Sequence, residues 1–199
     1  MGSVIGLVGL DASARFGRRR GWALHHLWSL ARYLGLFRCL EAVDWLRVRR
    51  LVFICRGNIC RSAYAEQRAR VMDLPATSFG VQAQDGRESV PMAIEVARAR
   101  GVDLRSHRAR SLSEFSSVTG DLLVAMEPGQ LPTLMKLARL QGAQLTLLGL
   151  WCSPTLPYLQ DPYGLAIDYF QTCFASIDDA IKNIRERMSS TARPPVEPL

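Results

Sequence analysis

The segment LVFICRGNICRS, residues 51–62, places a cysteine, an arginine and a serine directly after a short apolar run. Five residues separate Cys55 from Arg61, and Ser62 follows at once. A cysteine thiolate is a nucleophile, and an arginine guanidinium offers a planar fork of donors to two oxygens of a phosphoryl group. The spacing therefore indicates a loop that binds an anion and attacks it with sulfur.

The elements around this loop must hold it in shape. Residues 51–54 read as a buried strand and residues 63–72 as a helix. We expect residues 56–60 to curl with their N–H groups pointing inward, with Gly57 supplying permissive backbone dihedrals. The helix that begins near Ser62 adds the positive end of its dipole. The result is a cradle for an anion.

Cys55 at the base of this cradle would be affected by these dipoles and by Arg61, which favours the thiolate over the thiol. Ser62 is placed to donate a hydrogen bond to the sulfur. An inert buried cysteine, with a serine that caps the following helix, would also explain the spacing of Cys55, Arg61 and Ser62 if it stood alone. The strand, glycine, asparagine and helix around it together favour a functional loop.

Composition limits the other possibilities. The chain has 199 residues, of which 48% are hydrophobic and 22% charged, as expected for one globular domain with a sizeable core and an appendage. The net charge of +7 is uneven, because the first fifty residues hold nine arginines against three acidic residues. The remainder carries only +1, which disfavours a nucleic-acid-binding domain.

The cysteines and histidines argue against disulfides and metals. Five cysteines without a disulfide spacing indicate a reducing compartment, so we expect a cytoplasmic protein. CxxC motifs are absent and only His25, His26 and His107 are available, so no metal and no cofactor is expected.

The first fifty residues form a separate segment. Residues 1–17 show no period, whereas residues 18–45 repeat leucine and phenylalanine at helical spacing among arginines, at Leu27, Leu30, Leu34, Phe37 and Leu40. This pattern predicts a basic amphipathic helix. It could lie on a membrane surface or a partner protein, or it could pack against its own domain; the sequence favours neither. Arg32 and Arg38 interrupt any run long enough to span a bilayer.

After residue 50, strands and helices alternate. We expect strands at 51–54, 78–82, 121–126 and 145–150, and helices at 63–72, 92–100, 131–140 and 168–188. Such alternation predicts an α/β fold, an open doubly wound parallel sheet of about four strands in the flavodoxin-like manner, with helices on both faces. Ligands bind at the carboxyl ends of the strands in these sheets, where Cys55 lies. The Pro-rich residues 191–199 are expected to be disordered.

The motifs together resemble the low-molecular-weight protein tyrosine phosphatases. The similar segments occur in the family's order and span about residues 50–190: VFICRGNICRSAYAE at 52–66, TSFG at 77–80, GVDLRSHRAR at 101–110, DLLVAMEPGQL at 121–131 and QDPYG at 160–164. The resemblance divides the chain into an N-terminal extension, 1–49, a phosphatase domain, 50–190, and the tail. The nucleophile precedes the acid in this family, unlike in the larger tyrosine phosphatases.

The resemblance implies hydrolysis of phosphotyrosine without a metal or cofactor. Cys55 would form a cysteinyl-phosphate while Arg61 and the loop amides hold the phosphoryl oxygens. Asp161 would protonate the leaving oxygen and then deprotonate the attacking water. Asp161 and the following proline, taken without the family, indicate only a turn.

The resemblance also assigns supporting residues. Arg56, Gly57, Asn58, Ile59, Cys60 and Ser62 would line or shape the phosphate loop. Asn58, Ser78 and His107 match positions that brace this loop, although His107 could also be a surface histidine in a basic turn. Tyr163 matches an aromatic wall for a phenyl ring. Cys60 matches a second loop cysteine that can form a disulfide with Cys55, or it fills space behind the loop.

Some features depart from the family pattern or favour a rival. Arg56 stands where many members have an apolar or small residue, Gly164 replaces a second aromatic residue, and residues 81–89 lack the Trp or Tyr that some relatives place in the pocket. The pocket is therefore expected to be open and cationic. Arsenate reduction would require further cysteines that residues 121–134 do not provide, and arginine phosphatases carry Thr where this chain has Ile59. A non-catalytic phosphotyrosine-binding module is a third alternative.

Bacterial members of the family often act on tyrosine kinases of capsule and exopolysaccharide export, so such a kinase is the substrate that the resemblance implies. Nucleic acid is not an expected partner. The basic extension, through residues 18–45, would bring the enzyme to the membrane or to a partner. The sequence does not indicate an oligomeric state.

Overall fold

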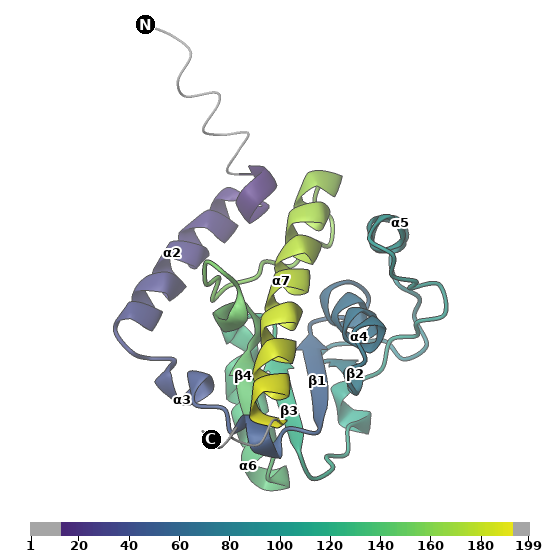
Figure 1. Cartoon of the computed structure of the whole chain (residues 1–199). Helices are drawn as coiled ribbons and strands as arrows, with labels where there is room; N and C mark the ends of the chain where they lie inside the picture. The colour runs from purple at the N-terminus through teal and green to yellow at the C-terminus, as the bar shows by residue number, and fades with distance from the viewer. Residues whose placement is uncertain (1–12, 193–199) are drawn as a thin grey trace, which may run out of the picture.

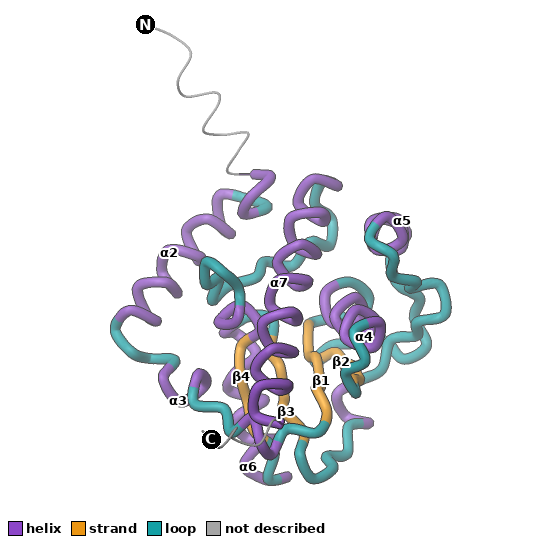
Figure 2. Tube along the Cα trace, in the orientation of Figure 1, coloured by secondary structure: helices purple, strands orange, loops and turns teal. Residues whose placement is uncertain are grey.

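The computed structural model describes residues 13–192. Its centre is a four-stranded parallel sheet in the order β2-β1-β3-β4 (Figure 2). The strands are β1 Arg50–Cys55, β2 Ala76–Gly80, β3 Asp121–Ala125 and β4 Gln144–Leu147. The predicted open, parallel, flavodoxin-like α/β fold is confirmed.

Helices connect and cover the strands. They are α4 Arg61–Val71, α5 Pro91–Ala99, α6 Leu131–Gln141 and α7 Ile167–Ala192. Helices α4 and α7 pack together on one face, and α6 lies against β3 and β4 on the other (Figure 1). The Tyr64 ring of α4 stacks on Phe174 of α7 with 3.9 Å between ring centroids, and its hydroxyl donates to Asp178 at 2.6 Å.

The two central strands form the middle of the core. Every residue of β3 and residues 51–55 of β1 are buried. Continuous apolar runs of this kind suit parallel strands, because helices cover both faces of the sheet. Cys55 therefore sits at the carboxyl end of a strand that is fixed on both sides, which gives the following loop a rigid base.

Two strands differ from the prediction by two residues or more at one end or both. Strand β2 lies two residues earlier than predicted, because Ala76 pairs with Leu51 and sets the register. Strand β4 ends at Leu147, and the next residues form a short 3₁₀ helix, η4 Leu148–Trp151. The chain bends there because the Leu156 N–H donates to the Gly149 carbonyl at 2.7 Å, an approach that leaves no space for a side chain at Gly149.

The extension is helical but not one helix. It forms α2 Arg19–Tyr33 and α3 Arg38–Glu41, and the break between them contains Gly35 in the left-handed region with φ of 82°. The predicted apolar stripe is divided as well. Phe37 and Leu40 are buried in the core, whereas Leu27, Leu30 and Leu34 are exposed. The extension thus packs on its own domain and still leaves apolar side chains uncovered.

Within residues 13–192, no helix combines the length and apolar character needed to cross a bilayer. Helix α7 continues to Ala192, past its predicted end at residue 188. The rest of the predicted tail, residues 193–199, lies outside the described residues, as does the unassigned segment 1–12.

Candidate active site

The loop between β1 and α4 surrounds the sulfur of Cys55. The Asn58 backbone N–H donates to Cys55 Sγ at 3.2 Å, and Ser62 Oγ donates to it at 3.0 Å. The contact from Ser62 is the one that the sequence predicted. Because both donors point at the sulfur, they stabilise negative charge on it.

The strained residue of the loop is Asn58, with φ of 55° in the left-handed region. The prediction gave this conformational freedom to Gly57, and it was wrong, since Gly57 is not among the residues with positive φ. Asparagine adopts this region more readily than most residues, because its short polar side chain forms local hydrogen bonds.

The side chain of Asn58 ties the loop to two other segments. Its Nδ2 group donates to Ser62 Oγ at 2.9 Å and to Ser78 Oγ at 2.7 Å, and its Oδ1 accepts from the Arg110 backbone N–H at 2.8 Å. Ser78 in turn donates to the buried carboxylate of Glu66 on α4. These bonds hold the loop in one conformation, as expected for Asn58 and Ser78.

His107 contacts the same loop from the other side. Its Nε2 lies 2.8 Å from the Asn58 carbonyl, and the residue is buried, so the interpretation as a surface histidine was wrong. A carbonyl only accepts, so Nε2 carries the proton. Burial lowers the pKa of His107 below its ordinary value and so favours the neutral ring, although the bond to the Asn58 carbonyl acts in the opposite direction.

Gly80 at the end of β2 makes the close approach possible. A Cβ atom there would lie 2.8 Å from the Arg56 carbonyl and 2.9 Å from the Asn58 nitrogen. Any other residue would therefore push the loop away from the sheet. The sequence analysis included this glycine in the TSFG motif but assigned it no role.

Arg61 is fully buried at the start of α4. Its Nη1 donates to the Leu159 carbonyl at 2.8 Å, and its Nη2 lies 2.9 Å from Asp161 Oδ2 and 3.4 Å from Glu127 Oε1. Burial alone would lower its pKa, but Asp161 and Glu127 raise it further than burial lowers it, so the group stays charged. Its Nε has no partner among the described residues.

The structure thus brings Asp161 to the loop as predicted. Its second oxygen, Oδ1, accepts from the Tyr163 backbone N–H at 3.3 Å. Glu127 was missed by the sequence analysis, although its position just after β3 was a signal, because strand ends meet at this edge of the sheet. No pattern in the sequence pointed to the Leu159 carbonyl, because every residue has a backbone carbonyl.

A pocket of about 350 Å³ opens above the sulfur. Its walls are formed by Cys55, Arg56, Gly57, Ile59, Cys60, Gln82, Gln84, Arg87, Asp161 and Tyr163. Tyr163 is 55% exposed at the rim, and the Arg87 guanidinium lies 5.9 Å from the centre of its ring. Arg56 is exposed and donates to Gln82 at 2.9 Å. The open, cationic pocket agrees with the sequence expectation.

Cys60 is a free, buried thiol that lines the same pocket. Burial raises its pKa well above the ordinary value, so it is protonated at neutral pH. Its pairing with Cys55 after oxidation remains a prediction. Among residues 13–192, no three His, Cys, Asp or Glu side chains gather as a metal site would require.

The chain belongs to the low molecular weight phosphotyrosine protein phosphatase family, whose model matches residues 50–193. Low molecular weight protein-tyrosine-phosphatase Etp of Escherichia coli (strain K12) is 27% identical over 146 residues, which cover 72% of this chain and 97% of Etp.

Solved structures are similar over the same region. The tyrosine phosphatase Wzb from Escherichia coli K30, in complex with sulphate, has a TM-score of 0.60 at 26% identity, covering 72% of this chain and 99% of Wzb. The YwlE arginine phosphatase from Geobacillus stearothermophilus has a TM-score of 0.63 at 23% identity, covering 72% of this chain and 94% of YwlE. The second likeness shows the fold alone.

His107 predicts a pH dependence of stability. Its pKa is lowered by folding, so the unfolded chain binds the proton more readily, and stability falls as the pH drops below about 6.5. His107→Gln keeps an N–H donor for Asn58 but does not titrate. We expect urea unfolding at several pH values to show a smaller acid loss of stability in His107→Gln than in the wild type.

His25→Gln is the control, because burial also lowers the pKa of His25, which lies outside the loop network. Each of the two substitutions should remove the part of the pH dependence of stability that its own histidine contributes. Parallel stability curves for the wild type and His107→Gln would contradict the assignment.

Proposed function

We propose that the protein hydrolyses phosphotyrosine in protein substrates through a cysteinyl-phosphate. The observation that carries the proposal is the buried Arg61, which lies beside a doubly hydrogen-bonded Cys55 sulfur and 2.9 Å from the carboxylate of Asp161. The nucleophile and the carboxyl group therefore line one pocket, and the buried guanidinium pairs with that carboxyl group behind it.

In the first step the Cys55 thiolate attacks phosphorus, and the bond from phosphorus to the tyrosine oxygen breaks. The substrate phosphate replaces Asp161 as a partner of Arg61, and Asp161, then protonated, gives its proton to that oxygen, so tyrosine leaves as the neutral phenol. The loop N–H groups and the guanidinium of Arg61, including its unpartnered Nε, receive the equatorial oxygens as charge develops on them. The products are free tyrosine hydroxyl and cysteinyl-phosphate.

In the second step Asp161, now ionised, takes a proton from water, and the water oxygen attacks phosphorus. The sulfur–phosphorus bond breaks, inorganic phosphate leaves and the thiolate returns. Ser62 stabilises this leaving thiolate through its hydrogen bond to Sγ. One carboxyl group thus serves both steps, first as acid and then as base.

The pocket supports an aryl phosphate over the rival substrates. Ile59 is a buried apolar wall of the pocket and Tyr163 offers an aromatic face at its rim, both of which suit a phenyl ring. Arsenate reduction needs further thiols, and Cys55 and Cys60 are the two cysteines that line the pocket. A binding module would not need Asp161 beside the phosphate site.

The nucleophile and the acid can be assigned together. We expect the wild type to hydrolyse 4-nitrophenyl phosphate with excess chelator present, and Cys55→Ser to be inactive. Asp161→Ala should lower kcat by roughly 10²–10⁴-fold, because the second step loses its base whatever the leaving group. Steady-state kinetics on an absorbance assay measures all three.

Folded Cys55→Ser protein, verified by circular dichroism, is the control for loss of structure. If the wild type binds the aryl phosphate tightly without hydrolysing it, the protein is a binding module and not a phosphatase.

A groove beside the pocket supports a protein substrate rather than a small one. It has a volume of about 610 Å³ and is lined by Arg87, Glu88, Ser89, Val90, Pro91, Ile94, Glu95, Arg98 and Arg105. Arg87 also lines the pocket above Cys55, so the two spaces lie next to each other. A polypeptide that places its phosphotyrosine in the pocket must continue past this rim.

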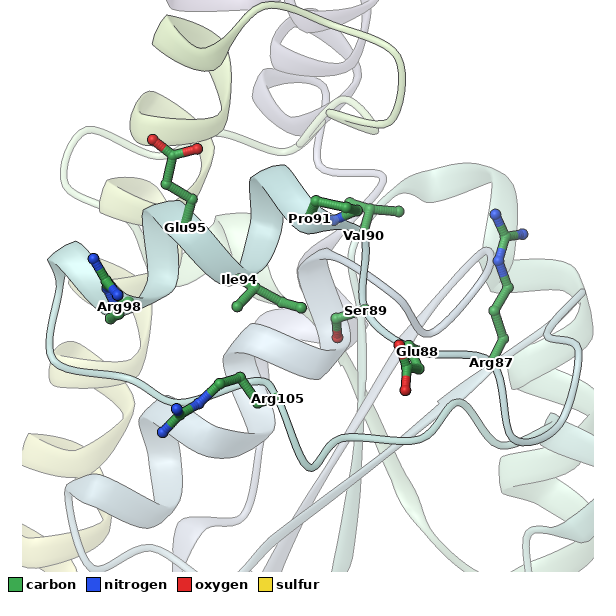
Figure 3. Close-up of a pocket in the computed structure, with 9 residues that line it drawn as sticks. All are labelled: Arg87, Glu88, Ser89, Val90, Pro91, Ile94, Glu95, Arg98 and Arg105. Atoms are coloured by element: carbon green, nitrogen blue, oxygen red, sulfur yellow. The ribbon is translucent and has the colours of Figure 1, made fainter.

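The lining of the groove suits a peptide with acidic and apolar residues. Val90 and Ile94 provide apolar surface, and Figure 3 shows Arg98 and Arg105 at one end and Arg87 at the other. Arg105 is paired with Asp103, whereas Arg98 makes no ion pair with any described residue. The hydroxyl of Ser89 is buried without a partner in the described part of the chain. We propose that substrate residues next to phosphotyrosine bind here.

Arg98 gives the test of this groove. We expect Arg98→Glu to lower kcat/KM for a phosphotyrosine peptide with acidic flanking residues by roughly five- to tenfold, because a favourable contact becomes repulsive. Turnover of 4-nitrophenyl phosphate should not change, since that substrate ends inside the pocket.

The matched control is Arg139→Glu, the same charge reversal at an exposed position of α6. Equal peptide kinetics for the two variants would exclude the groove from substrate binding.

We further propose a cytoplasmic enzyme whose α2 meets an anionic membrane surface, where a bacterial tyrosine kinase of polysaccharide export would be its substrate. Several large apolar side chains are exposed along α2 and at the residue that follows it, namely Trp22, Leu27, Leu30, Tyr33 and Leu34. Arg19 and Arg20 are exposed on the same helix. Apolar and basic side chains together favour an anionic interface.

Vesicle co-sedimentation checks this contact in the full-length protein. We expect Leu30→Glu with Leu34→Glu to bind phosphatidylglycerol vesicles much more weakly than the wild type, because carboxylates are repelled there. Leu140→Glu, at an exposed leucine of α6, is the control. Equal sedimentation of the wild type and the double variant would count against a membrane role.

A further inference from the structure

Two parts of the chain pack against the loop that carries Asp161, and one of them lies outside the family region. From within, Arg61 donates to the Leu159 carbonyl and pairs with Asp161. From outside, the loop meets α2, which precedes residues 50–193. In Figure 1 the green segment that leads into α7 runs between α7 and α2.

Gly21 is one point of contact between α2 and this loop. It is the buried residue of α2, and a Cβ atom placed on it would lie 2.1 Å from Gln160 Oε1. The same Cβ would lie 2.0 Å from the Phe16 carbonyl. The backbone of α2 therefore meets the side-chain amide of Gln160, the neighbour of Asp161, and the absence of a side chain at Gly21 leaves space for this contact.

The contact continues on the other side of Asp161. Arg18 Nη2 donates to the Gly164 carbonyl at 3.2 Å. A Cβ atom on Gly17 would lie 2.7 Å from Leu165 Cδ1, so this residue also touches the segment after the loop. The extension thus contacts the chain both before and after the proposed acid.

We propose that the N-terminal extension is a positioning element of the active site, in which Gly21 and Arg18 hold the loop that presents Asp161 to the leaving group. The proposal rests on the proposed function, since it needs Asp161 as the acid. A misplacement of about 1 Å can reduce the rate of such a proton transfer by up to 10²-fold. The contacts of Gly17, Arg18 and Gly21 lie on the chain around Asp161 and not on Cys55 or the phosphate loop, so we expect phosphate binding to be unaffected.

The leaving group separates a displaced acid from general damage. Phenolate is a poor leaving group and needs its proton, whereas 4-nitrophenolate leaves with little help. We expect Gly21→Ala to reduce kcat/KM, which reports the first step alone, by roughly 10–100-fold for phenyl phosphate and by much less for 4-nitrophenyl phosphate.

Ala23→Val is the control on the same helix, at an exposed position. Valine lowers helix propensity and alanine in place of glycine raises it, so a loss confined to Gly21→Ala cannot come from a weaker helix. Should Gly21→Ala fail to fold, Arg18→Ala provides the test, with an expected loss of roughly two- to fivefold confined to phenyl phosphate.

A double variant completes the experiment. In an Asp161→Ala background, Gly21→Ala should cause no further loss, because the group that it displaces is gone. Equal losses of kcat/KM on both substrates, a loss that persists in the Asp161→Ala background, or unchanged kinetics would each overturn the proposal. If Asp161→Ala alone leaves phenyl phosphate turnover intact, the proposed acid is wrong, which is a different failure.

Discussion

The site depends on one buried charge. The guanidinium of Arg61 has no exposed surface, and a cation removed from water is stable only with partners that compensate the lost hydration. Those partners are the Leu159 carbonyl and the carboxylates of Glu127 and Asp161, which follow two other strands of the sheet. The need to pair this charge therefore draws the loop with the proposed acid over the loop with the nucleophile.

The second constraint is the fixed shape of the phosphate loop. Asn58 bonds to the loop's own serine and to residues from β2 and from the segment before β3, while Gly80 leaves space for the backbone to approach. Donors already aimed at the sulfur and the phosphate position do not need to reorganise during the reaction, and such preorganisation is a large part of catalysis by oxyanion sites. Rigidity below the pocket contrasts with the open rim at Tyr163 and Arg87.

The extension has two faces with different environments. Its inner face contacts the loop around Asp161 and contributes Phe37 and Leu40 to the core, so it is part of the folded domain. Its outer face exposes apolar side chains that water does not favour. The extension therefore links an exposed apolar surface of the protein to the loop that carries Asp161.

The sequence by itself determined the alternation of strands and helices, the parallel sheet and the chemistry of Cys55, Arg61 and Ser62, because apolar runs and close spacing are local properties of the chain. Recognition of the family motifs added Asp161, which the local pattern marked only as a turn. The tertiary structure decided the rest: the charge partner Glu127, the close approach at Gly80, and the contact of the extension with the acid loop. These depend on segments distant in the sequence, whose packing and register no local pattern contains.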